Sequence, residues 1–134
     1  MSYEIERRVA VEAVIKACNL CRAVQAAHLA GGVIDKEDKS PVTVADFGAQ
    51  AVVSDHLAAT FPPDPLVGEE DSALLRHPEN ATLKETMLKH VRLISPRLKD
   101  KDIFAALDRG NAEGGSKGRF RALDPIDGTK GFLR

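Results

Sequence analysis

The sequence lacks several features that mark particular classes of protein. Its 19 basic and 20 acidic side chains leave a formal net charge of −1, and no long basic tract occurs. Neither nucleic acid nor an anionic membrane is therefore an expected partner. No apolar run approaches the ~20 residues that cross a bilayer, and the charged segment 1–8 is not typical of a cleaved signal. A cytoplasmic location is the default expectation.

Cysteine is scarce, with only Cys18 and Cys21 present, and their C-x-x-C spacing is compatible with a redox pair or half of a zinc site. Zinc normally takes four ligands, and on the same predicted helix only His28 lies near enough to add one. A catalytic C-x-x-C usually opens a helix, whereas this pair falls inside a helical pattern. We therefore predict that both thiols pack as small hydrophobic side chains.

Apolar residues at helical spacing predict two long helices in the first half of the 134-residue chain, which is long enough for one domain with a modest core. The first helix is expected over about 5–29, because Gly31-Gly32 can end it. The second is expected to begin at Thr43 as N-cap, with Asp46 in its first turn, and to end before Pro62-Pro63-Asp64-Pro65. The predicted apolar face of the first helix consists of Val9, Ala10, Ala13, Val14, Ala17, Leu20, Cys21 and Val24.

The second half of the sequence mixes shorter helices with short strands. Thr82-x-x-Glu85 matches a capping box and predicts a helix that ends before Pro96. A shorter helix is expected over 102–109, and the apolar segments Leu66-Val67 and 120–123 predict strands. Helices that precede a mixture of strands and helices indicate an α+β layered domain.

An acidic hexapeptide, residues 124–129, follows the second predicted strand. The carboxylates of Asp124 and Asp127 and the Ile126 carbonyl offer the oxygen ligands that Mg²⁺ prefers. Gly128 permits close approach of the backbone, and the N–H groups after it are suited to binding phosphate. A surface turn of the D-P-x-D-G type is the alternative interpretation.

Two further acidic segments occur earlier in the chain. Gly68-Glu69-Glu70-Asp71 places three carboxylates directly after the first predicted strand, where a bound cation would relieve their repulsion. A solvated loop is the alternative interpretation. Asp46 lies at a helix start, where it can hold a hydroxyl or a water for proton transfer, or can simply complement the helix dipole.

The three acidic segments occur in a characteristic order: S-P-V-T-x-A-D at 40–46, V-G-E-E at 67–70 and L-D-P-I-D-G-T-K-G-F-L-R at 123–134. In this order they resemble the signature of the lithium-sensitive inositol monophosphatase superfamily. The resemblance covers about 36–134 and is weaker in the first helix. The ending K-G-F-L-R, with Leu107-Asp108-Arg109-Gly110 before it, is similar to the bisphosphate nucleotidase branch of that superfamily.

The resemblance implies a layered α/β sandwich of the inositol monophosphatase and sugar phosphatase type, with 1–134 as its N-terminal metal-binding domain. It also implies a Mg²⁺-dependent phosphatase that forms no covalent enzyme intermediate. Asp46 and Thr129 would orient and deprotonate the attacking water, and the N–H groups of Gly128 and Thr129 would bind the substrate phosphate. The implied metal ligands are Glu69, Asp124, Asp127 and the Ile126 carbonyl.

The reaction implied by the resemblance is removal of the 3′-phosphate from adenosine 3′,5′-bisphosphate, a small-molecule phosphate substrate. An inositol-phosphate or fructose-bisphosphate phosphatase is the alternative enzyme, although the K-G-F-L-R ending argues against both. Asp71 stands where many members have serine, which leaves the roles of Glu70 and Asp71 open. The chain has no tryptophan, whereas longer members add a metal-ligating aspartate in a W-D-type motif and a substrate domain. We therefore expect a truncated form or a non-catalytic remnant.

Overall fold

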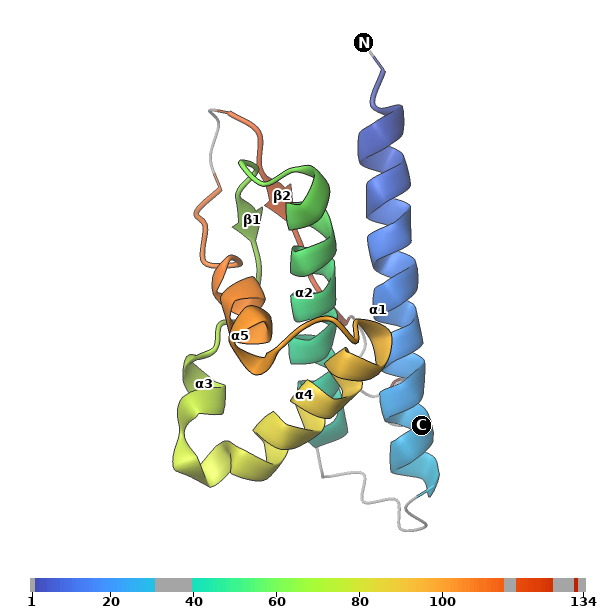
Figure 1. Ribbon diagram of the computed structural model, residues 1–134, viewed down its shortest axis with the longest axis vertical. Coiled ribbons are helices and arrows are strands. Elements are labelled where there is room, and N and C mark those ends of the chain that lie inside the picture. Colours follow the sequence, from blue (N-terminus) through green and yellow to red (C-terminus); the bar gives the residue numbers. More distant parts are fainter. Residues whose placement is uncertain (1, 31–39, 115–117, 127–131, 133–134) are drawn as a thin grey trace.

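Two long helices, α1 (Glu4–Ala30) and α2 (Ser40–Thr60), lie side by side and form the largest part of the fold (Figure 1). This computed structural model describes residues 2–30, 40–114, 118–126 and 132. The other elements are β1 (Leu66–Val67), α3 (Ala73–Arg76), the 3-10 helix η1 (Pro78–Asn80), α4 (Ala81–Ile94), α5 (Asp100–Asp108) and β2 (Arg121–Ala122).

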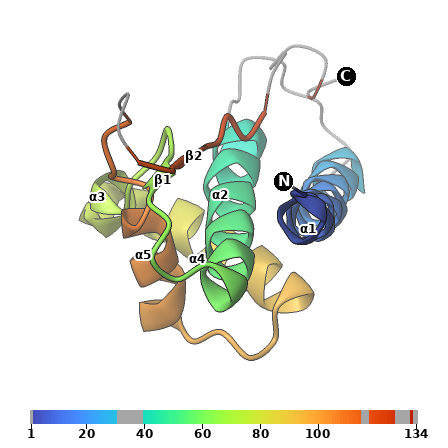
Figure 2. The same cartoon turned by 90° about the horizontal axis from the view of Figure 1, so that it is seen from above.

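The central helix is α2, because α1, α4 and α5 all pack against it (Figures 1 and 2). Most of its side chains between Val42 and Leu57 are buried, which explains why its sequence is apolar on nearly every side. Gln50 and Ser54 are buried polar residues on this helix. A helix enclosed by close-packed neighbours has a fixed position, so that functional groups on α2 are held firmly.

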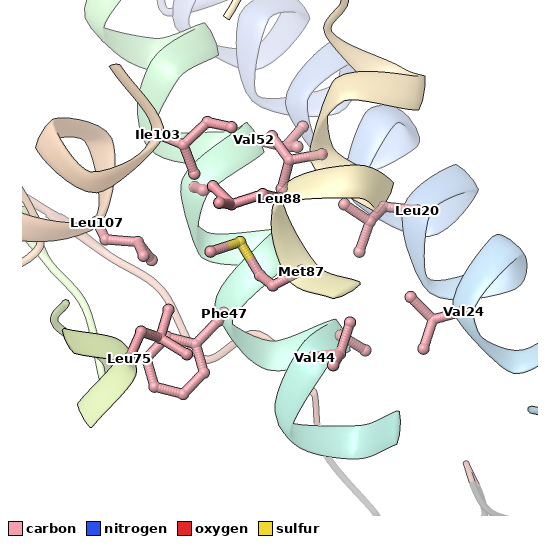
Figure 3. Close-up of a cluster of buried hydrophobic side chains, with 13 residues drawn as sticks. Leu20, Val24, Val44, Phe47, Val52, Leu75, Met87, Leu88, Ile103 and Leu107 are labelled. Atoms are coloured by element: carbon pink, nitrogen blue, oxygen red, sulfur yellow. The ribbon is translucent and has the colours of Figure 1, made fainter. Parts of the chain in front are cut away.

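The larger apolar cluster lies where the four main helices meet (Figure 3). Leu20 of α1, Val52 of α2, Leu88 of α4 and Ile103 of α5 are all at most 1% exposed. Burial of one such side chain contributes about 1.5–3 kcal/mol. A smaller cluster joins β1 to α1 and α2, and consists of Val9, Ala13, Val53, Leu57 and Leu66.

The two strands pair in parallel, with Leu66–Val67 in register with Arg121–Ala122. The pairing continues past β2, because the Leu123 N–H donates to the Val67 carbonyl at 2.9 Å. The chain after β2 then crosses α2 on its way toward α1 (Figures 1 and 2). The carboxyl ends of both strands therefore lie together beside the central helix.

The two predicted long helices are confirmed, with corrections at particular residues. α2 begins at Ser40 and not at Thr43. The predicted packing is wrong at Val14, which is 53% exposed, and at Cys18, which is also exposed, because neighbouring helices cover only part of α1. Cys21 packs against the larger cluster as predicted, and burial, followed by the Cys18 and Asp46 charges, raises the pKa of its thiol to about 11.

The capping box predicted at Thr82 and Glu85 is wrong, although the helix that it was expected to open exists. α4 begins at Ala81, and its N-cap Asn80 makes no side-chain capping hydrogen bond. The physical reason is η1, whose 3-10 turn runs directly into α4, so that Thr82 already lies within the helix.

The remaining predictions of secondary structure are confirmed within a few residues. α5 begins at Asp100, and the Asp102 carboxylate accepts a hydrogen bond from the Lys99 N–H at 2.9 Å in its first turn. β2 is shorter than the predicted segment 120–123. The structure is mostly helical and has a small sheet, which agrees with the predicted α+β class. Across the described ranges, no helix combines the length and the apolarity that crossing a membrane requires.

Candidate functional site

The parallel register of β1 and β2 brings two of the acidic segments together. Glu69 and Asp124 each lie two residues beyond the end of a strand, at matching positions of the pairing. Both residues line one cavity with a volume of about 450 Å³, whose other described lining residues are Val67, Gly68, Ala122 and Leu123. The sheet therefore places these two carboxylates, which are far apart in sequence, around a common space.

Asp46 adds a third carboxylate from the first part of α2. Burial raises its pKa to about 6, and the negative charges of Glu70, Glu69 and Asp124 contribute further in that order. Its Oδ1 atom is buried and has no hydrogen-bond partner among the described residues. The helix thus holds one partly desolvated carboxylate within electrostatic range of both strand ends.

Mutual repulsion extends to the rest of the acidic segment after β1. Burial raises the pKa of Glu70, and the charges of Glu69 and Asp71 raise it further. Within the described ranges, the ion pairs of arginine and histidine involve other acids, and none includes this group of carboxylates. A cation would relieve the repulsion, because uncompensated carboxylates at close range favour bound positive charge.

The donor set fits a hard cation in its chemistry, since Glu69 and Asp124 offer carboxylate oxygens and Ile126, two residues after Asp124, offers a backbone carbonyl. In the part of the chain that the structure describes, however, no three acidic, histidine or cysteine side chains converge closely enough to hold a metal. Asp127, Gly128 and Thr129, the other residues of the sequence prediction, lie outside the described residues. Their roles stay predictions.

Two anchors that the sequence reasoning missed hold the acidic segment 68–71 in place. The buried Gln50 side chain of α2 bonds to the backbone of the segment. Just after the segment, the Asp108 carboxylate accepts hydrogen bonds from the Ser72 N–H and hydroxyl, both at 2.9 Å. The signal available in the sequence was the Gln50 amide within the otherwise apolar stretch 47–53, one turn after Asp46.

A second cavity, of about 430 Å³, lies between the last turns of α1, the start of α2 and the N-terminal part of α4. His28 and His90 line it, together with apolar residues such as Val24 and Leu83. The carboxylates of the three acidic segments are not among its lining residues. We therefore place the candidate site at the strand ends, where the charged groups gather.

Comparisons with known proteins identify similar sequences. A family model described as the inositol monophosphatase family matches residues 3–134. The chain is 44% identical to 3′(2′),5′-bisphosphate nucleotidase 1 of Candida albicans, over 98% of the chain and 40% of that protein. It is 45% identical to 3′(2′),5′-bisphosphate nucleotidase 1 of Arabidopsis thaliana, over 100% of the chain and 41% of that protein. The chain spans about 40% of the length of these curated relatives.

Proposed function

Because the chain belongs to the inositol monophosphatase family, we propose that its full-length protein is a Mg²⁺-dependent phosphomonoesterase that removes the 3′-phosphate of adenosine 3′,5′-bisphosphate. The observation that carries this proposal is the parallel pairing of β1 and β2, which puts Glu69 and Asp124 around one cavity. Asp46 lies within electrostatic range of both. The shared name of the relatives, 3′(2′),5′-bisphosphate nucleotidase 1, supports the choice of substrate class.

The proposed ligands of Mg²⁺ are all oxygen atoms, which this cation prefers. They are the carboxylates of Glu69, Asp124 and Asp127 and the carbonyl of Ile126. When bound, Mg²⁺ supplies positive charge for the phosphate oxygens and makes water more acidic. The repulsion among the carboxylates at the strand ends supports a cation at this position.

Asp46 and Thr129 are proposed to orient and deprotonate the attacking water. Without a bound cation, burial and the neighbouring carboxylates raise the pKa of Asp46 to about 6. A bound Mg²⁺ would lower this pKa again, so that the carboxylate is ionised at neutral pH and can accept a proton from water. The unpartnered Oδ1 atom offers a buried acceptor for such a proton. The backbone N–H groups of Gly128 and Thr129 are proposed to bind the phosphate.

The proposed setting of this site is the layered α/β sandwich of the family. Residues 1–134 would form its N-terminal metal-binding domain, and a C-terminal substrate domain would complete the site in the full-length protein. We propose a cytoplasmic location and a small-molecule substrate, with no nucleic-acid or membrane partner. Because no three metal-binding side chains converge in the described ranges, a non-catalytic remnant that binds metal weakly is the second candidate for the 134-residue chain alone.

The test is phosphate release by the purified full-length protein. Adenosine 3′,5′-bisphosphate and inositol 1-phosphate are supplied separately, with Mg²⁺ and again after chelation of the metal. We expect metal-dependent turnover of the bisphosphate at a clearly higher rate. Preference for inositol 1-phosphate would support the alternative phosphatase, and release from neither substrate would contradict the proposal. The same assay on the 134-residue chain is expected to show turnover far below that of the full-length protein.

A further inference from the structure

We propose that Gln50 is a positioning residue, which fixes the backbone of the acidic segment 68–71 and thereby sets the distance between Glu69 and Asp46. The inference rests on the proposed function, because it assumes that Glu69 binds a metal beside Asp46. Gln50 is 0% exposed and lies on the central helix among apolar neighbours. A buried amide is costly unless all its polar atoms have partners, so its hydrogen bonds show what it holds.

Both ends of the Gln50 amide bind the main chain of the same residue. Its Oε1 accepts a hydrogen bond from the Glu70 N–H at 2.9 Å, and its Nε2 donates to the Glu70 carbonyl at 2.5 Å. The Nε2 also lies 3.3 Å from the Leu107 carbonyl at the end of α5. The side chain therefore pairs with Glu70 as a neighbouring strand would, and it ties the segment to two helices.

Two glycines let the main chain approach this amide closely. A Cβ atom at Gly68 would lie 2.7 Å from the Cδ and Oε1 of Gln50, and one at Gly110 would lie 2.5 Å from its Nε2. Real Cβ atoms do not tolerate such distances, so any other residue would displace either the amide or the loop. The Gly68 N–H also donates to the Gly110 carbonyl at 2.8 Å. The amide thus fills a closely fitted space between the segment after β1 and the segment after α5.

The position of Gln50 on α2 gives this contact a consequence for the site. Asp46 and Gln50 are four residues apart, so they lie one above the other on the same side of the helix. One rigid helix consequently carries the proposed base and the anchor of the loop that contains Glu69. Loss of the anchor would leave the backbone N–H and carbonyl of Glu70 without these partners and would free the loop to move relative to Asp46.

The test measures Mn²⁺ binding to the full-length protein by electron paramagnetic resonance of the free ion. Gln50→Met keeps the volume of the side chain and removes its hydrogen bonds. Val91→Ala, a truncation in the core of α4, serves as the matched control for lost stability. We expect Gln50→Met to weaken Mn²⁺ binding by about 10-fold or more, the usual cost of removing support behind a metal ligand. Val91→Ala is expected to change the affinity less than about 2-fold, because it lies outside this support.

A second variant keeps the inference testable if Gln50→Met does not fold. Gly110→Ala leaves Gln50 and all the carboxylates in the sequence but pushes the amide from its place, so it should weaken Mn²⁺ binding as well. Affinities of both variants equal to that of Val91→Ala at similar thermal stability would overturn the role of Gln50. Asp124→Asn separates this failure from failure of the proposed function, because unchanged Mn²⁺ binding in that variant would contradict the metal site itself.

Discussion

The helical body and the strand-end region of this protein are built from opposite kinds of interaction. Where α1, α2, α4 and α5 meet, side chains such as Leu88 and Ile103 are at most 1% exposed and fully apolar. At the ends of β1 and β2, burial raises the pKa of Asp46, and the negative charges of Glu70, Glu69 and Asp124 raise it further. The body is held together by apolar packing, whereas the strand ends accumulate negative charge that no ion pair of the described residues neutralises.

The central helix α2 belongs to both regions, so that apolar core residues and polar residues near the strand ends lie on the same helix. The side chains of Val44 and Val52 on α2 join the apolar cluster (Figure 3). On the same helix, Gln50 bonds to the segment after β1, and Asp46 lies within electrostatic range of the strand ends. Stability and chemistry are thus separable by substitution even within α2. Changes in the body should lower the free energy of unfolding and leave metal binding nearly unchanged. Changes of the carboxylates at the strand ends should weaken metal binding and leave the free energy of unfolding nearly unchanged.

The largest effect is expected from a cavity in the helical body. Leu88→Ala should lower the free energy of unfolding by about 2–5 kcal/mol, because it removes buried methyl groups from a packed core. Urea denaturation measures this loss. Mn²⁺ affinity measured at a temperature where the variant is folded should stay close to that of the parent. A large loss of affinity would show that the two regions are not separable.

The next largest effect concerns turnover. Asp124→Asn in the full-length protein should reduce Mg²⁺-dependent phosphate release by about 100-fold or more, because it removes a proposed metal ligand and its charge. The fold should be unaffected, since Asp124 lines a cavity and packs in neither apolar cluster. Glu85→Gln, on the exposed side of α4, is the control. Ordinary turnover by Asp124→Asn, measured beside that control, would remove Asp124 from the site.

A smaller effect should appear in the pH dependence of stability. Folding raises the pKa of Asp46 from 3.8 to about 6. The native state therefore binds the proton more tightly than the unfolded state does. The resulting contribution to the free energy of unfolding is fully present below pH 3.8 and is lost as the pH rises through about 6. Because Asp46 is only half-buried, solvent screening should limit this contribution to the free energy of unfolding to about 1 kcal/mol. Asp46→Asn should lack this loss, which thermal unfolding of both proteins at pH 4 and 7.5 in metal-free buffer would detect. Parallel pH profiles would contradict the raised pKa.

The smallest effect is expected for Mg²⁺ on the 134-residue chain. Weak binding to an incomplete ligand set should raise the melting temperature by a few degrees. This corresponds to less than about 1 kcal/mol at Mg²⁺ concentrations up to about three times the dissociation constant. The shift should disappear in Asp124→Asn but persist in Glu85→Gln. A shift of equal size in all three chains would indicate a general salt effect and no site at the strand ends.

The sequence predicted the helical body better than the strand ends for physical reasons. Helical spacing of apolar residues is a local signal, and it located α1, α2, α4 and α5. It missed α3, a single helical turn that begins directly after Ser72. Ser72 is held by hydrogen bonds to Asp108, a residue that is distant in sequence. It also predicted a capping box at Thr82, where the preceding 3-10 turn had already started the helix.

For the candidate site, the sequence itself identified the types of residue, and only the family resemblance implied that they meet in space. Glu69 and Asp124 were predictable as acids that follow short apolar segments. Their meeting depends on the parallel register of β1 with β2, and two strands so short contain no pattern that fixes a register. Gln50 was missed because one amide in an apolar helix has no periodicity, and its function depends on a loop 20 residues away in sequence.

The most direct test of a cation site at the strand ends is an anomalous difference map from crystals of the full-length protein soaked in Mn²⁺. We predict a strong peak within coordination distance of the Glu69 and Asp124 carboxylates and beside Asp46. Mn²⁺ is a suitable probe because it takes the same oxygen ligands as Mg²⁺. The account is contradicted if the soaked crystals show no peak at the ends of β1 and β2, or show one only in the cavity lined by His28 and His90.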